Sequence, residues 1–217
     1  SFFAKARNPY WFGRAQFSGK HYASARKGFR KCKPSDAMAS LYLGRTCLEL
    51  DDPKAAVVAL VRANSKKPGD KRILYYLGTA HRRAGEPHKA IMPFTELATL
   101  SPTSAGPQAE LGQVFLEARQ PQAATQAFSE AIRRAPKRAR NYTWLGIAHF
   151  RMRSFAGAKE ALRNALRRDA KNPTSHYWLG RTLYELRDYA RAARAFQEGS
   201  RLDPKSPLPR LWLARAY

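Results

Sequence analysis

The stretch HYWLGRTLYELRDYARAARAFQEGSRLDP, residues 176–204, predicts two amphipathic helices joined by a tight turn at Arg187-Asp188. Its landmarks recur when the sequence is shifted against itself by 34 residues. The recurring positions are a glycine that follows a leucine (Gly44, Gly78, Gly112, Gly146, Gly180, then Ala214), an alanine (Ala56, Ala90, Ala124, Ala158, Ala192), a bulky residue (Leu60, Phe94, Phe128, Leu162, Phe196) and a proline (Pro68, Pro102, Pro136, Pro204, with Ala170 as the exception). The chain is therefore an array of helical hairpins.

Each landmark has a physical role in such a hairpin. The Leu-Gly pair of the first helix and the alanine of the second mark a close approach of two helices, because a larger side chain would hold their axes apart. The bulky residue fills the space between successive hairpins, and the proline ends the second helix because it cannot continue one.

This pattern resembles the tetratricopeptide repeat family over nearly the whole sequence. The resemblance implies an all-α fold, a right-handed superhelical solenoid of helix-turn-helix repeats. One departure is the family's usual tryptophan three residues before the leucine, which is replaced here by Ser40, Leu74, Gln108, Tyr142, His176 and Arg210.

The period divides the chain into seven predicted segments. The first is a degenerate basic repeat about three residues short, in which Trp11-Phe12-Gly13-Arg14 mirrors Tyr42-Leu43-Gly44-Arg45. The predicted boundaries are 1–36, 37–70, 71–104, 105–138, 139–172 and 173–206, followed by the first helix of a truncated repeat at 207–217. Because solenoids need capped ends and none is evident after Tyr217, we expect the sequence to be a segment of a longer protein.

The formal net charge is +24, from 40 Lys and Arg against 16 Asp and Glu. Such a charge exceeds what solubility requires and points to an anionic partner or surface. We find no apolar run long enough for a signal peptide or a membrane span. The compartment stays open between a bacterial cell envelope or periplasm and the cytoplasm.

Nothing in the pattern indicates catalysis, a cofactor or a metal. Cys47, His81 and His149 share one predicted core column, and Cys32 is expected to lie against the start of the next helix rather than beside Cys47. No histidine has a Ser, Cys or Asp partner at a spacing that the repeats preserve, and no Gly-rich phosphate loop or metal-ligand spacing is present. We predict a non-enzymatic chain without cofactors.

The first helices carry the candidate binding residues. In the helical projection, the residue before the leucine and the residue after the glycine fall on one stripe opposite the packed Leu-Gly pair. The family resemblance implies that this stripe lines the concave groove of the superhelix. The predicted partner-binding residues are Trp11, Arg14, Tyr42, Arg45, Arg72, Tyr76, Arg140, Trp144, Tyr177, Trp178, Arg181, Trp212 and Arg215.

Aromatic residues in this stripe are followed by arginines three residues later, which suggests stacking platforms flanked by cationic donors. The alternative is that the rings only pack against the neighbouring first helix. The fourth repeat interrupts the stripe with Glu110 and Glu117, so we expect two separate positive surfaces. A lysine and asparagine clamp for a terminal carboxylate, which the family's chaperone-binding members use, is missing from these columns.

The leading functional hypothesis is a scaffold within a larger assembly, with a groove for an acidic or extended protein segment. The second hypothesis is the repeat region of a bacterial exopolysaccharide-export or pilus-assembly protein that handles an anionic polymer. The third is nucleic-acid binding, for which stacking rings and arginines are also suited.

Overall fold

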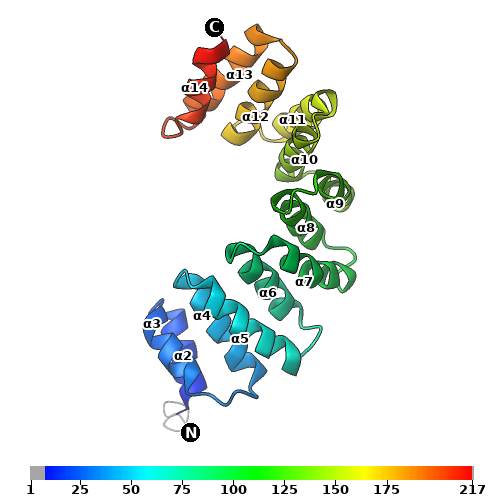
Figure 1. Cartoon of the computed structure of the whole chain (residues 1–217). Coiled ribbons are helices and arrows are strands. Elements are labelled where there is room, and N and C mark those ends of the chain that lie inside the picture. Colours follow the sequence, from blue (N-terminus) through cyan, green and yellow to red (C-terminus); the bar gives the residue numbers. More distant parts are fainter. Residues whose placement is uncertain (1–7, 217) are drawn as a thin grey trace. The chain divides into compact units, whose positions relative to one another are not determined.

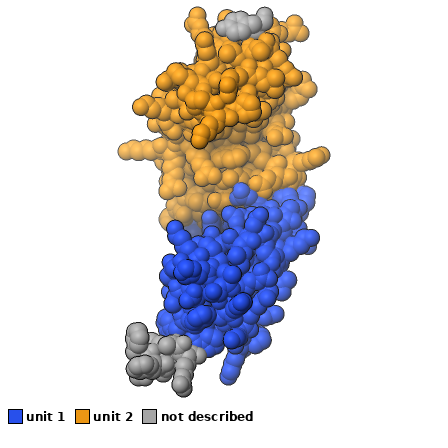
Figure 2. Space-filling view, turned by 90° about the vertical axis from the view of Figure 1, so that its left-hand side faces the viewer, with its two compact units in different colours: residues 1–102 blue, residues 103–217 orange. Residues whose placement is uncertain are grey.

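The structure is a computed structural model that describes residues 8–216. Residues 1–7 of the predicted first repeat and Tyr217 of the predicted seventh segment lie outside the described residues. The described chain forms thirteen α-helices and no strand (Figure 1). It divides into two compact units, unit 1 with residues 1–102 and unit 2 with residues 103–217 (Figure 2). The fold is an all-α helical repeat solenoid, as the sequence predicts.

The helices alternate between a first and a second helix of each pair. The first helices are α2 (Pro9–Ser18), α4 (Ala37–Glu49), α6 (Lys71–Arg83), α8 (Ala105–Glu117), α10 (Ala139–Arg151), α12 (Pro173–Glu185) and α14 (Leu208–Ala216). The second helices are α3 (Tyr22–Arg30), α5 (Pro53–Lys66), α7 (Pro87–Thr99), α9 (Pro121–Arg134), α11 (Phe155–Arg168) and α13 (Tyr189–Leu202). Unit 1 holds α2–α7 and unit 2 holds α8–α14.

Within each unit, first helices of adjacent pairs contact one another. In unit 1, α4 contacts both α2 and α6, and in unit 2 α10 contacts α8 and α12, which in turn contacts α14. No comparable contact joins neighbouring second helices in the described part of the chain. First helices of adjacent pairs therefore lie side by side within each unit. We call the surface of these helices the first-helix face.

Local sequence explains where the helices start. Most first helices begin after a residue whose side chain accepts a hydrogen bond from the first turn: Asn8, Asp36, Asp70, Ser104 and Asn172. These side chains satisfy backbone donors that a helix start leaves unpaired. Pro87 and Pro121 occupy the first helical position of α7 and α9, where a missing N–H costs nothing.

The turn inside each pair is equally regular. One residue there has a left-handed backbone: Lys20, Asp51, Gly85, Arg119, Arg153 or Arg187, with φ between 53° and 76°. After α12, the Arg187 N–H donates to Tyr184 O and the Asp188 N–H to Leu183 O, both at 2.9 Å. This pattern ends a helix by satisfying its last carbonyls. Glycine supplies the left-handed residue only at Gly85, and the other turns place a side chain there at a conformational cost.

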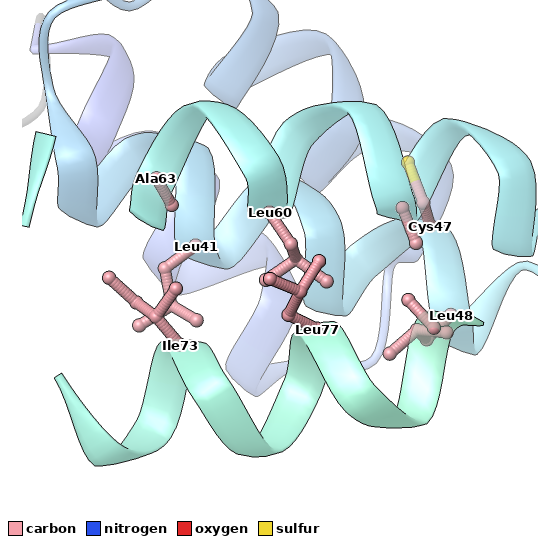
Figure 3. Close-up of a cluster of buried hydrophobic side chains, with 9 residues drawn as sticks. Leu41, Cys47, Leu48, Leu60, Ala63, Ile73 and Leu77 are labelled. Carbon is pink, nitrogen blue, oxygen red and sulfur yellow. The ribbon is translucent and has the colours of Figure 1, made fainter. Parts of the chain in front are cut away.

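The core confirms the predicted glycine and alanine columns. The alanines of the second helices, such as Ala56 and Ala158, are fully buried. A Cβ at Gly180 would lie 2.6 Å from a ring carbon of Phe196. The bulky second-helix residue therefore lies directly over the glycine of its own pair, in addition to filling the space between pairs. Figure 3 shows the core around Leu60 of α5, which meets Leu77 of α6.

The predicted core column is confirmed at Cys47, which is 1% exposed, and at His81, which is 8% exposed. His149 is half-buried. Both cysteines are free thiols, and Cys32, just past the end of α3, donates from Sγ to the carbonyl of Gly28 in that helix at 3.7 Å. None of the helices between residues 8 and 216 combines the length and the apolar run needed to cross a bilayer.

Candidate functional site

The aromatic column of the first helices is half-buried. Three of its rings stack on the bulky residue of the preceding second helix: Tyr42 on Phe29 at 5.7 Å between ring centroids, Trp144 on Phe128 at 6.3 Å and Trp212 on Phe196 at 6.2 Å. The helical projection placed these rings opposite the packed side of the helix. The structure instead puts one face of each ring into the contact between pairs, because a first helix packs against two neighbours and not one.

Helix α2 is an exception, because its column residue Trp11 is exposed rather than half-buried. Trp11 of α2 is 46% exposed, and Tyr10 beside it contacts Tyr42 of the next pair. Tyr10 lies 6.2 Å from Phe29 and 6.2 Å from Tyr42 between ring centroids.

In unit 1, two arginines lie between the rings of adjacent first helices. The Arg14 guanidinium carbon is 4.4 Å from the centre of the Tyr42 ring in the next helix, and Arg14 donates to the Tyr10 hydroxyl at 3.2 Å. The Arg45 guanidinium lies 5.0 Å from Tyr42 in its own helix and 4.8 Å from Tyr76 in the next. These distances fit cation–π interactions. The predicted residues Arg14, Tyr42, Arg45 and Tyr76 therefore form one continuous row.

Unit 2 repeats this arrangement around Arg181. Four rings surround its guanidinium carbon, Trp212 at 4.0 Å, Phe150 at 5.1 Å, Trp178 at 5.6 Å and Tyr177 at 6.0 Å. We call Arg181 and these rings the Arg181 cage. One N–H of the guanidinium donates to the Tyr177 hydroxyl at 3.1 Å, and Nε is buried without a hydrogen-bond partner. The Arg215 guanidinium lies 4.9 Å from the Trp212 ring, so the cage and Arg215 form the row of unit 2.

Several arginines of the second helices are instead held by carboxylates. Arg133 and Arg134 both bind Glu130 at 2.7 Å, and their hydrogen bonds lower the pKa of Glu130 to about 2. Arg201 likewise pairs with Glu198 at 2.6 Å. By contrast, none of the carboxylates in residues 8–216 pairs with Arg14, Arg45, Arg181 or Arg215. The cations of the rows are thus held by rings and keep their charge unneutralised.

Two of the arginines predicted to bind the partner do not belong to the rows of rings and unpaired arginines. Arg72 lies 3.2 Å from Asp70 and is already neutralised. Burial would raise the pKa of Asp70, but hydrogen bonds from Arg72 and Lys67 hold it well below its ordinary value, so the pair is ionic. Arg140 of α10 is exposed and outside the rows. Its helix interrupts the arginine column, since the residue after Gly146 is the buried Ile147.

Sequence reasoning missed two members of the unit 1 row, Tyr10 and Phe17. The Arg45 guanidinium lies 4.8 Å from the Phe17 ring, and Phe17 is 5.8 Å from Tyr42 between ring centroids. A signal was present in the sequence, because Tyr10, Arg14 and Phe17 have the spacing of one helix face.

A cleft adjoins the Arg181 cage. It has a volume of about 320 Å³ and lies between the first half of α12 and the segment that leads into α14. Its walls include Pro173, Tyr177, Trp178, Asp203, Leu208 and Pro209. Tyr177 and Trp178 are therefore shared between the cleft and the cage. No group of three metal-ligating side chains occurs in the described residues.

Comparison with known proteins places the chain among helical repeat proteins. The model described as "Tetratricopeptide repeat" matches residues 54–105, 109–156 and 145–207, which is more than half of the chain. No curated protein sequence gives a significant match.

Several solved structures share the fold. MamA from Desulfovibrio magneticus RS-1, from residue 41 to its end, is 24% identical over 78% of this chain and 96% of that one, with a TM-score of 0.71. The pilF protein of Pseudomonas aeruginosa is 19% identical over 98% of both chains, with a TM-score of 0.73. YrrB, described as a TPR protein with an unusual peptide-binding site, is 14% identical over 84% of this chain and 93% of that one, with a TM-score of 0.67.

Proposed function

The chain belongs to the tetratricopeptide repeat family, and we propose that it is a non-catalytic scaffold whose first-helix faces bind an acidic, extended segment of a protein partner. Repeat proteins of this kind present a continuous wall of side chains rather than an enclosed pocket. YrrB is described as having a peptide-binding site, so the fold accommodates a peptide.

One observation carries the proposal. The arginines of the rows are fixed by aromatic rings and lack carboxylate partners, whereas second-helix arginines such as Arg133 and Arg201 are paired. A guanidinium that is partly desolvated and unpaired favours an incoming carboxylate, because a charge-assisted hydrogen bond is stronger there than in water. Its orientation is already fixed, which reduces the entropy lost on binding.

Protein binding accounts for the site better than nucleic-acid binding does. Two rings of the rows have one face committed to packing, Tyr42 on Phe29 and Trp212 on Phe196. Bases of a single strand stack on aromatic faces that are open. Single carboxylates, by contrast, need only the edge of each guanidinium. An anionic polysaccharide also offers carboxylates, and the experiment below separates it from a peptide.

The test measures fluorescence anisotropy of the 217-residue chain with a labelled acidic peptide, in competition with single-stranded RNA and with an anionic polysaccharide. Arg45→Gln and Arg181→Gln are each expected to weaken peptide binding roughly tenfold near physiological salt. Arg194→Gln on α13 is the matched control, since it removes the same charge outside the first-helix face.

Equal losses in Arg194→Gln and Arg181→Gln would mean that only net charge matters and would contradict the proposal. Tighter binding of RNA, with a steep salt dependence, would favour the nucleic-acid hypothesis. Tighter binding of the polysaccharide would favour the polymer hypothesis.

A further inference from the structure

We infer that unit 2 recognises its partner at two adjacent points: the Arg181 cage takes an acidic side chain, and the cleft between α12 and α14 takes a bulky apolar side chain close to it in the partner's sequence. The inference rests on the proposed function and specifies the kind of segment that this unit selects.

The cleft suits one apolar side chain. Its volume of about 320 Å³ lies at the lower end of ligand pockets, which suits a single large side chain better than a cofactor or a folded element. Rings and aliphatic groups from Tyr177, Trp178, Leu208 and Pro209 form much of its walls, and Thr174, Asp203 and Ser206 add polar groups. Leu208 is 48% exposed, so an incoming apolar group would cover apolar surface that now faces water.

Charge decides which side chain occupies which point. Asp203 is among the residues that line the cleft, and it disfavours a second carboxylate there. Arg181 does not line the cleft, and its guanidinium lies 4.0 Å from the Trp212 ring without a carboxylate partner. An acidic residue of the partner is therefore directed to Arg181 and an uncharged bulky residue to the cleft.

The geometry also limits the spacing between the two anchors. Tyr177 lines the cleft and accepts a hydrogen bond from Arg181 at 3.1 Å, so a single ring separates the two points. An extended chain advances about 3.3–3.6 Å per residue, so the acidic and the apolar residue should be about one to three positions apart. This recognition differs from simple attraction to a basic surface, because it requires a fixed pair of side chains.

The experiment selects peptides from a displayed random library on the 217-residue chain and on four variants. Leu208→Ser alters the cleft, and Leu211→Ser is its matched control on the same helix, with 52% of Leu211 exposed and no part in the cleft. Arg181→Gln alters the cage, and Arg194→Gln is its control. Circular dichroism checks that each variant keeps its helicity.

The wild-type chain should enrich peptides with an acidic residue and a Phe, Leu, Ile or Met at a constant short spacing. For a selected peptide, Leu208→Ser should weaken binding roughly fivefold to tenfold, the effect of uncovering about 40–60 Å² of apolar surface. It should also abolish the apolar preference and keep the acidic one. Replacing the apolar residue of the peptide by alanine should have no additional effect in Leu208→Ser, as expected for a coupled pair.

Enrichment of acidic residues without an apolar neighbour, or equal losses in Leu208→Ser and Leu211→Ser, would overturn this inference and leave the proposed function intact. An absence of acidic enrichment, with binding unaffected by Arg181→Gln, would overturn the proposed function and this inference together.

Discussion

Replacing Gly146 by alanine tests the contact on which each helix pair depends. A Cβ at Gly146 of α10 would lie 2.5 Å from Leu162 Cγ and 3.0 Å from its Cδ2 in α11. Cγ is the branch point of a side chain that is fully buried, so it has no open space into which to rotate. Either the leucine must leave its rotamer or the two helices must move apart, and both reduce packing in the core.

The magnitude follows from two opposing effects. Overpacking a well-filled core costs about 1–3 kcal/mol. Replacing a helical glycine by alanine recovers about 0.5–1 kcal/mol through helix propensity. We therefore expect Gly146→Ala to lower the free energy of unfolding by up to about 2.5 kcal/mol, measured by urea denaturation followed by circular dichroism.

Gly106→Ala is the matched control. At Gly106 of α8 the nearest atom to an added Cβ is Ser104 Oγ, at 3.6 Å, which is ordinary contact. This variant should be as stable as the wild-type chain or more stable by up to about 1 kcal/mol. If both variants gain stability to the same extent, the glycine column does not mark a close approach and the packing argument is refuted.

Three further predictions concern the turns, the aromatic column and pH. Arg187→Gly should raise the free energy of unfolding by about 0.5–1 kcal/mol, because Arg187 has φ of 60° and glycine adopts that conformation without strain; an unchanged urea midpoint would contradict this. Trp144→Ala should destabilise the chain by about 2–4 kcal/mol, because it removes the stacking on Phe128. Trp11→Ala is the control and should cost less than half of that, because Trp11 is 46% exposed. Similar shifts in melting temperature for the two variants would argue against the packing role. Burial lowers the pKa of His149 below its ordinary value of 6.5, so the unfolded chain binds the proton more tightly, and stability should fall as the pH drops below about 6.5. His149→Phe should reduce this slope in thermal melts between about pH 5 and pH 8, whereas an identical slope would assign it to other groups.

Much of the fold could be predicted because its determinants are local and repeated. The Leu-Gly pair, the alanine and the terminating proline recur at one spacing, and they occupy the first helix, the buried side of the second helix and its end. The prolines at Pro87 and Pro121 start helices for the same local reason, a fixed φ and no N–H to satisfy. Periodicity does not, however, reveal that the bulky residue lies on the glycine of its own pair.

The candidate site was only partly predictable. The helical projection identified the arginines and aromatic residues of the rows, and it placed Arg72 among them as if it were an unpaired cation. The ion pair with Asp70 involves a residue two positions away, outside the helix that the projection describes. Tyr10 and Phe17 were missed even though Tyr10, Arg14 and Phe17 repeat the spacing of Tyr177, Arg181 and Tyr184 in α12.

The sequence by itself determined the number and order of the helical hairpins, the family and the excess of positive charge, because these depend on spacing along one chain and on composition. Only the tertiary structure decided what surrounds each arginine. The guanidinium of Arg181 lies among rings from α10, α12 and α14, and that of Arg45 among rings from α2, α4 and α6. Such neighbours come from residues about 30 positions away, and their distances are set by how closely adjacent first helices pack.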